Sequence, residues 1–164
     1  MLNRTRELNS MARQIIRSNE YTTIATVDPK GTPWVSIVAY SFDHDWNLYF
    51  VSIPTSRHGK HIKSKKRIAC TIFDSQQDWG KGVGLQIEAE CKIISKAEFD
   101  HVSKVYFNRK YPYGIVEPDT KKFFKKSLES EYSLYKFYKI TPKTVWMNNP
   151  YSKEDKRVKV DLNA

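Results

Sequence analysis

Ser56, Arg57, His58 and Lys60 place a hydroxyl, a guanidinium, an imidazole and an ammonium group close together in the sequence. Pro54 ends the strand-like run before them, and Thr55 and Ser56 are candidate N-caps, so the pattern predicts a helix that begins here. The first amides of a helix lack intrahelical acceptors, and cations are disfavoured at that end of the helix dipole. Three basic side chains there therefore indicate a bound anion, and a phosphate group suits these donors. A solvated basic turn is the alternative interpretation.

The segments before this cluster predict a helix and a hairpin. Residues 2–18 carry apolar side chains at three- and four-residue spacing, which is typical of an amphipathic helix. Tyr21–Asp28 and Trp34–Phe42 alternate as strands around the turn sequence DPKGTP. Both faces of Trp34–Phe42 are largely apolar, so we expect this strand to be covered on both sides, by a helix or a second subunit.

The segments after the cluster predict further strands and two helices. Leu85–Ile93 alternates strictly between apolar and polar residues, as a half-buried strand does. Ser95 and Glu98 form a potential capping box that opens a helix reaching about Tyr111. The remaining predicted segments are a strand at Arg67–Asp74, a weaker helix at Thr120–Leu128, and final strands at Tyr132–Ile140 and Lys143–Asn148 that are broken at Pro142.

These elements predict a mainly β fold with α additions. We expect a small β-barrel of six or seven strands, with an N-terminal helix and a helix after the fifth strand. Residues 1–150 are predicted to form a single domain, and residues 151–164 are predicted to form a charged, flexible tail.

The composition and charge of the chain restrict the classes of protein to which it can belong. The chain has 164 residues, of which 40% are hydrophobic, and a net charge of +10, so a globular protein with anionic partners is expected. No segment approaches the roughly 18 apolar residues of a membrane span, and no signal-peptide pattern occurs, which predicts a cytoplasmic protein. Cys70 and Cys91 are predicted to be buried free thiols. His58 and His61 have helical spacing but no further ligands near them, so no metal site is predicted.

Three segments resemble the FMN-binding split barrel of the pyridoxamine 5'-phosphate oxidase-like superfamily, in particular its small bacterial members. They are VDPKGTPWVSIVAY, YFVSIPTSRHGKHIKSKKRIAC and GLQIEAECKII, within a resemblance that spans about Ile15–Asn148. In such proteins the first segment contacts the flavin ring and the second binds the FMN phosphate. The resemblance also implies a homodimer with flavin at the subunit interface.

The resemblance assigns cofactor contacts residue by residue. His58 stands where the oxidases usually carry lysine, and Ser52 stands in place of a threonine at the strand end. The implied ring contacts are Val35, Ser36, Ile37 and Val38; the implied phosphate contacts are Ser56, Arg57 and Lys60; Gln77 or Gln86 is implied at the ring edge, with Trp79 flanking it. Trp34 replaces an arginine that true pyridoxamine phosphate oxidases use, and their C-terminal arginine-histidine signature does not occur. Vitamin B6 oxidase activity is therefore not expected.

The leading hypothesis is an FMN-dependent oxidoreductase acting on a small molecule, with FMN favoured over the deazaflavin F420 and FAD. The flavin carries the electron chemistry, and no side chain is assigned as a catalytic acid or base. One alternative is a flavin-binding or sensing module without turnover. Another is a basic β-barrel that binds single-stranded nucleic acid, which is less favoured because charge blocks are commonly solvated surface.

Overall fold

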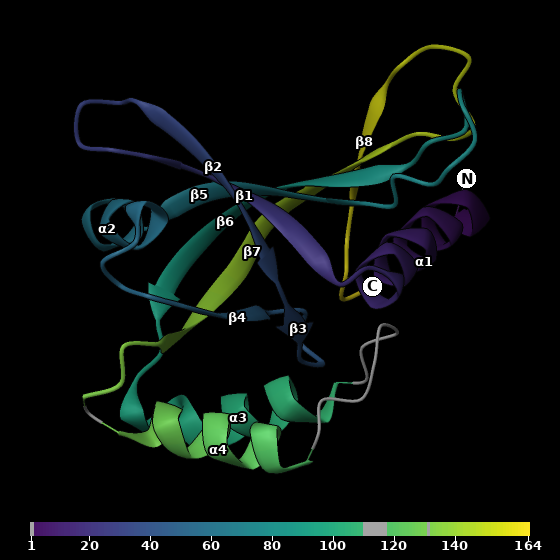
Figure 1. Cartoon of the computed structure of the whole chain (residues 1–164). Coiled ribbons are helices and arrows are strands. Elements are labelled where there is room, and N and C mark those ends of the chain that lie inside the picture. The colour runs from purple at the N-terminus through teal and green to yellow at the C-terminus, as the bar shows by residue number, and fades with distance from the viewer. Residues whose placement is uncertain (1, 110–117, 131) are drawn as a thin grey trace.

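The chain folds into a curled antiparallel sheet with helices around it, in a computed structural model that describes residues 2–109, 118–130 and 132–164 (Figure 1). The strands are β1 (Tyr21–Val27), β2 (Pro33–Ala39), β3 (Ser41–Phe42), β4 (Leu48–Ser52), β5 (Arg67–Phe73), β6 (Gly84–Ile93), β7 (Lys136–Asn148) and β8 (Arg157–Val160). The helices are α1 (Leu2–Ser18), α2 (Arg57–Ser64), α3 (Phe99–Asn108) and α4 (Pro118–Glu129), with a 3-10 turn at Lys96–Glu98. The predicted mainly β split barrel is confirmed.

The strand order leaves a split between β2 and β4. The hydrogen-bonded order is β2-β1-β5-β6-β7-β4-β3, with β8 added to β7. Curling brings β2 and β4 close to each other although they are not paired. Helix α2 contacts β1 and β2 and lies at one side of the sheet, with α1 at the other side (Figure 1). The basic residues predicted to bind an anion therefore lie beside the opening of the barrel.

The main core fills the inside of the curled sheet. The apolar stripe predicted for residues 2–18 packs against it, with Ala12 and Ile16 fully buried. Strand β6 alternates as predicted, with Leu85 and Ile87 buried and Glu88 exposed. Cys70 and Cys91 are buried free thiols, as predicted, and burial raises the pKa of Cys70 to about 12.

A smaller second core holds α3 and α4 below β4. Phe107 of α3 and Phe124 of α4 make an edge-to-face contact at 6.2 Å between ring centroids. Tyr49 and Phe137 contribute from β4 and β7. The aromatic residues of the predicted helix after β6 thus serve packing in this cluster. The predicted end of that helix near Tyr111 lies outside the described residues.

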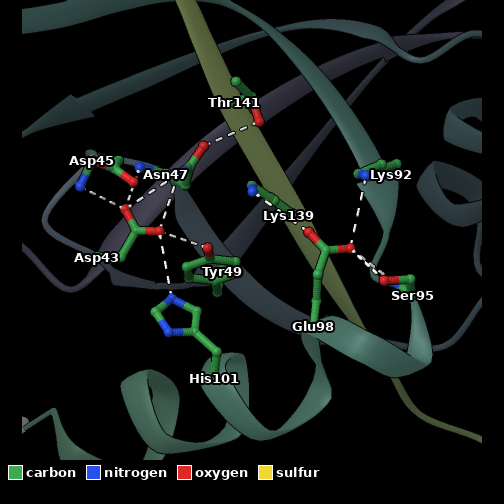
Figure 2. Close-up of polar contacts among 10 residues, drawn as sticks. All are labelled: Asp43, Asp45, Asn47, Tyr49, Lys92, Ser95, Glu98, His101, Lys139 and Thr141. Carbon is green, nitrogen blue, oxygen red and sulfur yellow. Dashed lines mark hydrogen bonds and ion pairs between the residues drawn. The ribbon is translucent and has the colours of Figure 1, made fainter.

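The turn between β3 and β4 is organised by a buried carboxylate (Figure 2). Asp43 accepts hydrogen bonds from the Tyr49 hydroxyl at 2.7 Å and from the Asn47 side-chain amide at 3.0 Å. Backbone N–H groups of Asp45 and Asn47 also donate to it, and His101 of α3 lies 3.8 Å away. Burial opposes the charged form, but the donors outweigh it, so the pKa of Asp43 is lowered. The cluster ties α3 to the barrel.

Two predictions about the C-terminal half are wrong. The two strands predicted around Pro142 form one strand, β7, because a register shift opposite Glu88 and Ala89 leaves an extra residue beside the proline. A bulge of this kind tolerates a residue without a backbone N–H. The tail predicted to be flexible instead forms β8, which pairs with β7 from Arg157 to Val160. Val160 and Leu162 are buried in the main core, and this burial holds the segment in place.

The helices of the described residues are all too short or too polar to cross a lipid bilayer.

Candidate anion site at the start of helix α2

Helix α2 begins as the sequence predicts. Ser56 is its N-cap in an extended conformation, and its hydroxyl accepts a hydrogen bond from the Gly59 N–H at 3.1 Å. Within the described part of the chain, the backbone N–H groups of Arg57 and His58 have no acceptor. This end of the helix therefore presents free donors at the positive end of the dipole.

Glycine at position 59 allows α2 to approach the preceding turn closely. A Cβ atom there would lie 2.6 Å from the carbonyl oxygen of Pro54 and 2.9 Å from that of Ile53. The helix is also anchored by His61, whose Nδ1 lies 3.1 Å from the Thr26 hydroxyl in the interior. The first turn of α2 is thus held in a defined position relative to β1 and β4.

Two cations at this end of the helix face solvent. Arg57 and Lys60 are exposed, and neither forms an ion pair with any described residue. The Arg57 guanidinium carbon lies 4.1 Å from the centroid of the Trp34 ring on β2. This cation–π contact leaves the N–H edges of the guanidinium open to a ligand.

His58 connects the two strands on either side of the split. Its Nδ1 lies 3.1 Å from the Ser36 hydroxyl of β2, and its Nε2 lies 2.7 Å from the Ser52 hydroxyl of β4. Burial, and then the nearby His61, lower the pKa of His58 below its ordinary value. The indole N–H of Trp34 donates to Ser36 at 3.0 Å. The Ser36 hydroxyl therefore lies between Trp34, whose indole N–H donates to it, and the imidazole of His58, which reaches Ser52 on its other side.

The four β2 residues implied as ring contacts divide between two faces of the strand. Val35 and Ile37 point outward and are 56% and 72% exposed. Ser36 faces His58, and Val38 is buried in the main core. The sequence predicted that this strand is covered on both sides, whereas in the single chain its outer face is open.

The structure places the other three implied ring residues away from α2. Gln77 bridges the two ends of its own loop, because its side chain forms hydrogen bonds with the backbone of Asp74 and Val83. Trp79 is 99% exposed at the tip of that loop. Gln86 lies on β6 and accepts a hydrogen bond from Arg157. Strand β6 is three strand intervals from β2 in the same sheet, about 14 Å along it.

The residues around the start of α2 fit a phosphate group. Free amides, the Ser56 hydroxyl and two exposed cations without acidic partners among the described residues all belong to the first turn of α2 and its cap. A dianionic phosphate needs such donors, and no carboxylate occupies them among the described residues.

Trp34 and Gly59 belong to this site but were not assigned to it from the sequence. In the sequence, Trp34 stands out only as a departure from the arginine of related oxidases. Its i,i+2 spacing from Ser36 on a strand puts both residues on one face, which is the signal that could have linked it to the site. The close approach at Gly59 has no sequence signal other than the glycine itself.

Comparison with known proteins identifies the fold. The pyridoxamine 5'-phosphate oxidase family model matches residues 8–149. Among solved structures, the chain is similar to a heme-binding protein of Mycobacterium smegmatis, with a TM-score of 0.69 and 15% identity over 92% of this chain and 57% of that one. It therefore spans little more than half of that protein.

Two further structures match nearly their whole length. A heme storage protein of Vibrio cholerae has a TM-score of 0.60 and 11% identity over 82% of this chain and 89% of that one. An FAD-binding protein of Mesorhizobium loti has a TM-score of 0.59 and 14% identity over 84% and 91%. At these identities the likeness is one of fold. No curated protein matches the sequence.

Proposed function

Because this chain belongs to the pyridoxamine 5'-phosphate oxidase family, we propose that it is an FMN-dependent oxidoreductase that holds the phosphate of its cofactor at the start of α2. The observation that supports the proposal is that exposed Arg57 and Lys60 stand in the first turn of a capped helix, with no acidic side chain paired to either cation among the described residues.

The roles of the residues follow from their chemistry. The free amides of Arg57 and His58 and the hydroxyl of Ser56 donate to phosphate oxygens, and Arg57 and Lys60 neutralise the charge of about two units. Each charge-assisted hydrogen bond contributes about 1.5–3 kcal/mol when it is well shielded from water. Bound FMN supplies electron transfer between a donor and an acceptor, and the protein holds and orients it.

We further propose that the flavin ring lies along β2 at the interface of a homodimer. Val35 and Ile37 are largely exposed in the single chain, which suits a strand that a second copy and a flavin cover. Gln86 lies on β6, and Gln77 and Trp79 lie in the loop before it, so ring contacts from these residues would come from the partner subunit. A small-molecule substrate would enter at this interface.

The proposal is tested first by the absorption spectrum of the purified protein and by FMN titration. The parent protein is expected to show flavin bands, directly or after reconstitution. Arg57→Ala is expected to weaken FMN binding at least about tenfold, since it removes a charged donor. Arg67→Ala is the matched control, because Arg67 is an exposed arginine beyond the end of the same helix. Unchanged FMN affinity in Arg57→Ala would refute the phosphate assignment.

Heme is the competing cofactor, because two of the similar structures are named as heme proteins. Both ring nitrogens of His58 lie within hydrogen-bond distance of serine hydroxyls, so ligation of iron by His58 would require the loss of one of these contacts. A Soret band in place of flavin bands would therefore overturn the choice of cofactor. If flavin binds but NADH and NADPH are not oxidised with any of a range of acceptors, the chain is a flavin-binding module rather than an enzyme.

A further inference from the structure

We infer that Trp34 is a positioning residue that makes the site select FMN over flavins without a phosphate, an inference that rests on the proposed function. The side chain makes two contacts toward α2. Its ring face stacks under the Arg57 guanidinium at 4.1 Å. Its Nε1–H donates to Ser36, which is in turn bonded to His58. An indole carries no charge, so its effect on a phosphate is exerted through these two neighbours.

The stacking contact restricts Arg57. An exposed arginine has many rotamers, and ordering one on ligand binding opposes affinity. Arg57 has no ion-pair partner among the described residues, and the Trp34 ring is the aromatic surface beneath its guanidinium. The ring thereby holds the guanidinium near the helix end before a ligand arrives, while its N–H groups remain free.

The indole N–H donates to a set of hydrogen-bonded side chains behind the helix. Ser36 accepts from Trp34 and lies 3.1 Å from Nδ1 of His58, and Nε2 of His58 lies 2.7 Å from the Ser52 hydroxyl. This arrangement fixes the ring of His58 in the first turn of α2. The backbone N–H of His58 is one of the free amides. Fixing the His58 ring therefore also restricts the position of this amide donor.

The test compares dissociation constants for FMN and riboflavin, which share the ring system but differ in the phosphate. Trp34→Leu removes both contacts and is expected to weaken FMN binding about threefold to thirtyfold while leaving riboflavin binding unchanged. Trp34→Phe keeps a ring face without the N–H and is expected to lie between Trp34→Leu and the parent. Trp146→Leu is the matched control, since Trp146 lies on β7 and is 37% exposed against 38% for Trp34.

A double-mutant cycle with Arg57→Ala separates positioning from general damage. Arg57→Ala is expected to cost less FMN affinity in the Trp34→Leu background than in the parent. The reason is that the Arg57 guanidinium is no longer held in position once the Trp34 ring is removed. Additive losses, or an equal loss of FMN and riboflavin, would overturn the inference. If Trp34→Leu does not fold, Trp34→Phe decides by itself: weaker FMN binding with unchanged riboflavin binding supports the inference, and an equal loss of both overturns it. A parent protein that binds FMN no better than riboflavin contradicts the proposed phosphate site itself.

Discussion

At the scale of single residues, His58 belongs to the proposed anion site and also connects two strands, and only the first of these roles is predicted from the sequence. It belongs to the basic cluster at the helix start, yet its ring joins β2 to β4 through Ser36 and Ser52. Phe50 lies against the ring edge at 6.2 Å between centroids. Because burial lowers its pKa, the side chain is neutral near pH 7, and the charge of the site comes from Arg57 and Lys60.

This lowered pKa predicts how stability depends on pH. In the unfolded chain His58 has an ordinary pKa of about 6.5, so below that value the unfolded state binds more protons than the folded state. The free energy of unfolding should therefore fall as the pH drops from about 7 to 5. His58→Gln, which has no titrating ring, should lose less over that range in urea unfolding experiments.

The control for this experiment is His44→Gln, because the His44 side chain is 82% exposed in the β3–β4 turn. It should keep the pH profile of the parent. Superimposable profiles for the parent and His58→Gln would show that His58 titrates alike in both states, contrary to its buried position.

At the scale of elements, α2 and the turn before it form one rigid unit. The helix is held by the Ser56 cap, by the contact of His61 with Thr26 and by the close approach of Gly59 to the carbonyl groups of the turn. Backbone atoms surround the Gly59 position, so a side chain there cannot be accommodated by a rotamer change.

Gly59→Ala should therefore push the start of α2 away from the turn. We expect it to lower the free energy of unfolding by about 1–3 kcal/mol, as overpacking does, and to weaken FMN binding. The higher helix propensity of alanine offsets at most about 1 kcal/mol of this loss. Gly82→Ala is the control in thermal unfolding and FMN titration, since a Cβ atom there meets nothing within 4 Å. Equal stability of the two variants would mean that the turn before α2 moves to accommodate the added methyl group, contrary to this prediction.

At the scale of the whole molecule, the outer face of β2 is the surface that we propose a second copy of the chain to cover. β2 lies at one edge of the sheet and exposes Val35 and Ile37. The cofactor residues implied by resemblance lie partly on this edge and partly three strands away. A second copy of the chain would cover the face and bring both sets to one flavin.

The proposed dimer predicts a particle of twice 19.3 kDa in light scattering. Ile37→Asp places a carboxylate in the proposed interface, where burial of an unpaired charge is unfavourable, and should shift the mass toward the monomer and weaken FMN binding. Phe123→Asp is the control, because Phe123 is similarly exposed at 77% but lies on α4. A monomeric parent, or dissociation caused only by the α4 variant, would place the interface elsewhere.

Local chemistry was sufficient to predict several features of the fold. Pro54 and Ser56 act within a few residues, so the start of α2 was predictable, as were the alternation of β6 and the burial of both cysteines. The strand at Pro142 was mispredicted because the bulge that accommodates the proline depends on pairing with β6. The tail was mispredicted for the same kind of reason, since β8 is stabilised by β7 rather than by its own sequence.

The sequence by itself determined a basic, capped helix start next to a hairpin, and with it the expectation of a bound anion, because these features depend on neighbours along the chain. Only the tertiary structure decided that Trp34 lies under Arg57, that His58 joins the two sides of the split, and that Gln77, Trp79 and Gln86 lie apart from them. Such contacts follow from the curl and register of the sheet. Those are set by pairings between distant segments, which no local pattern encodes.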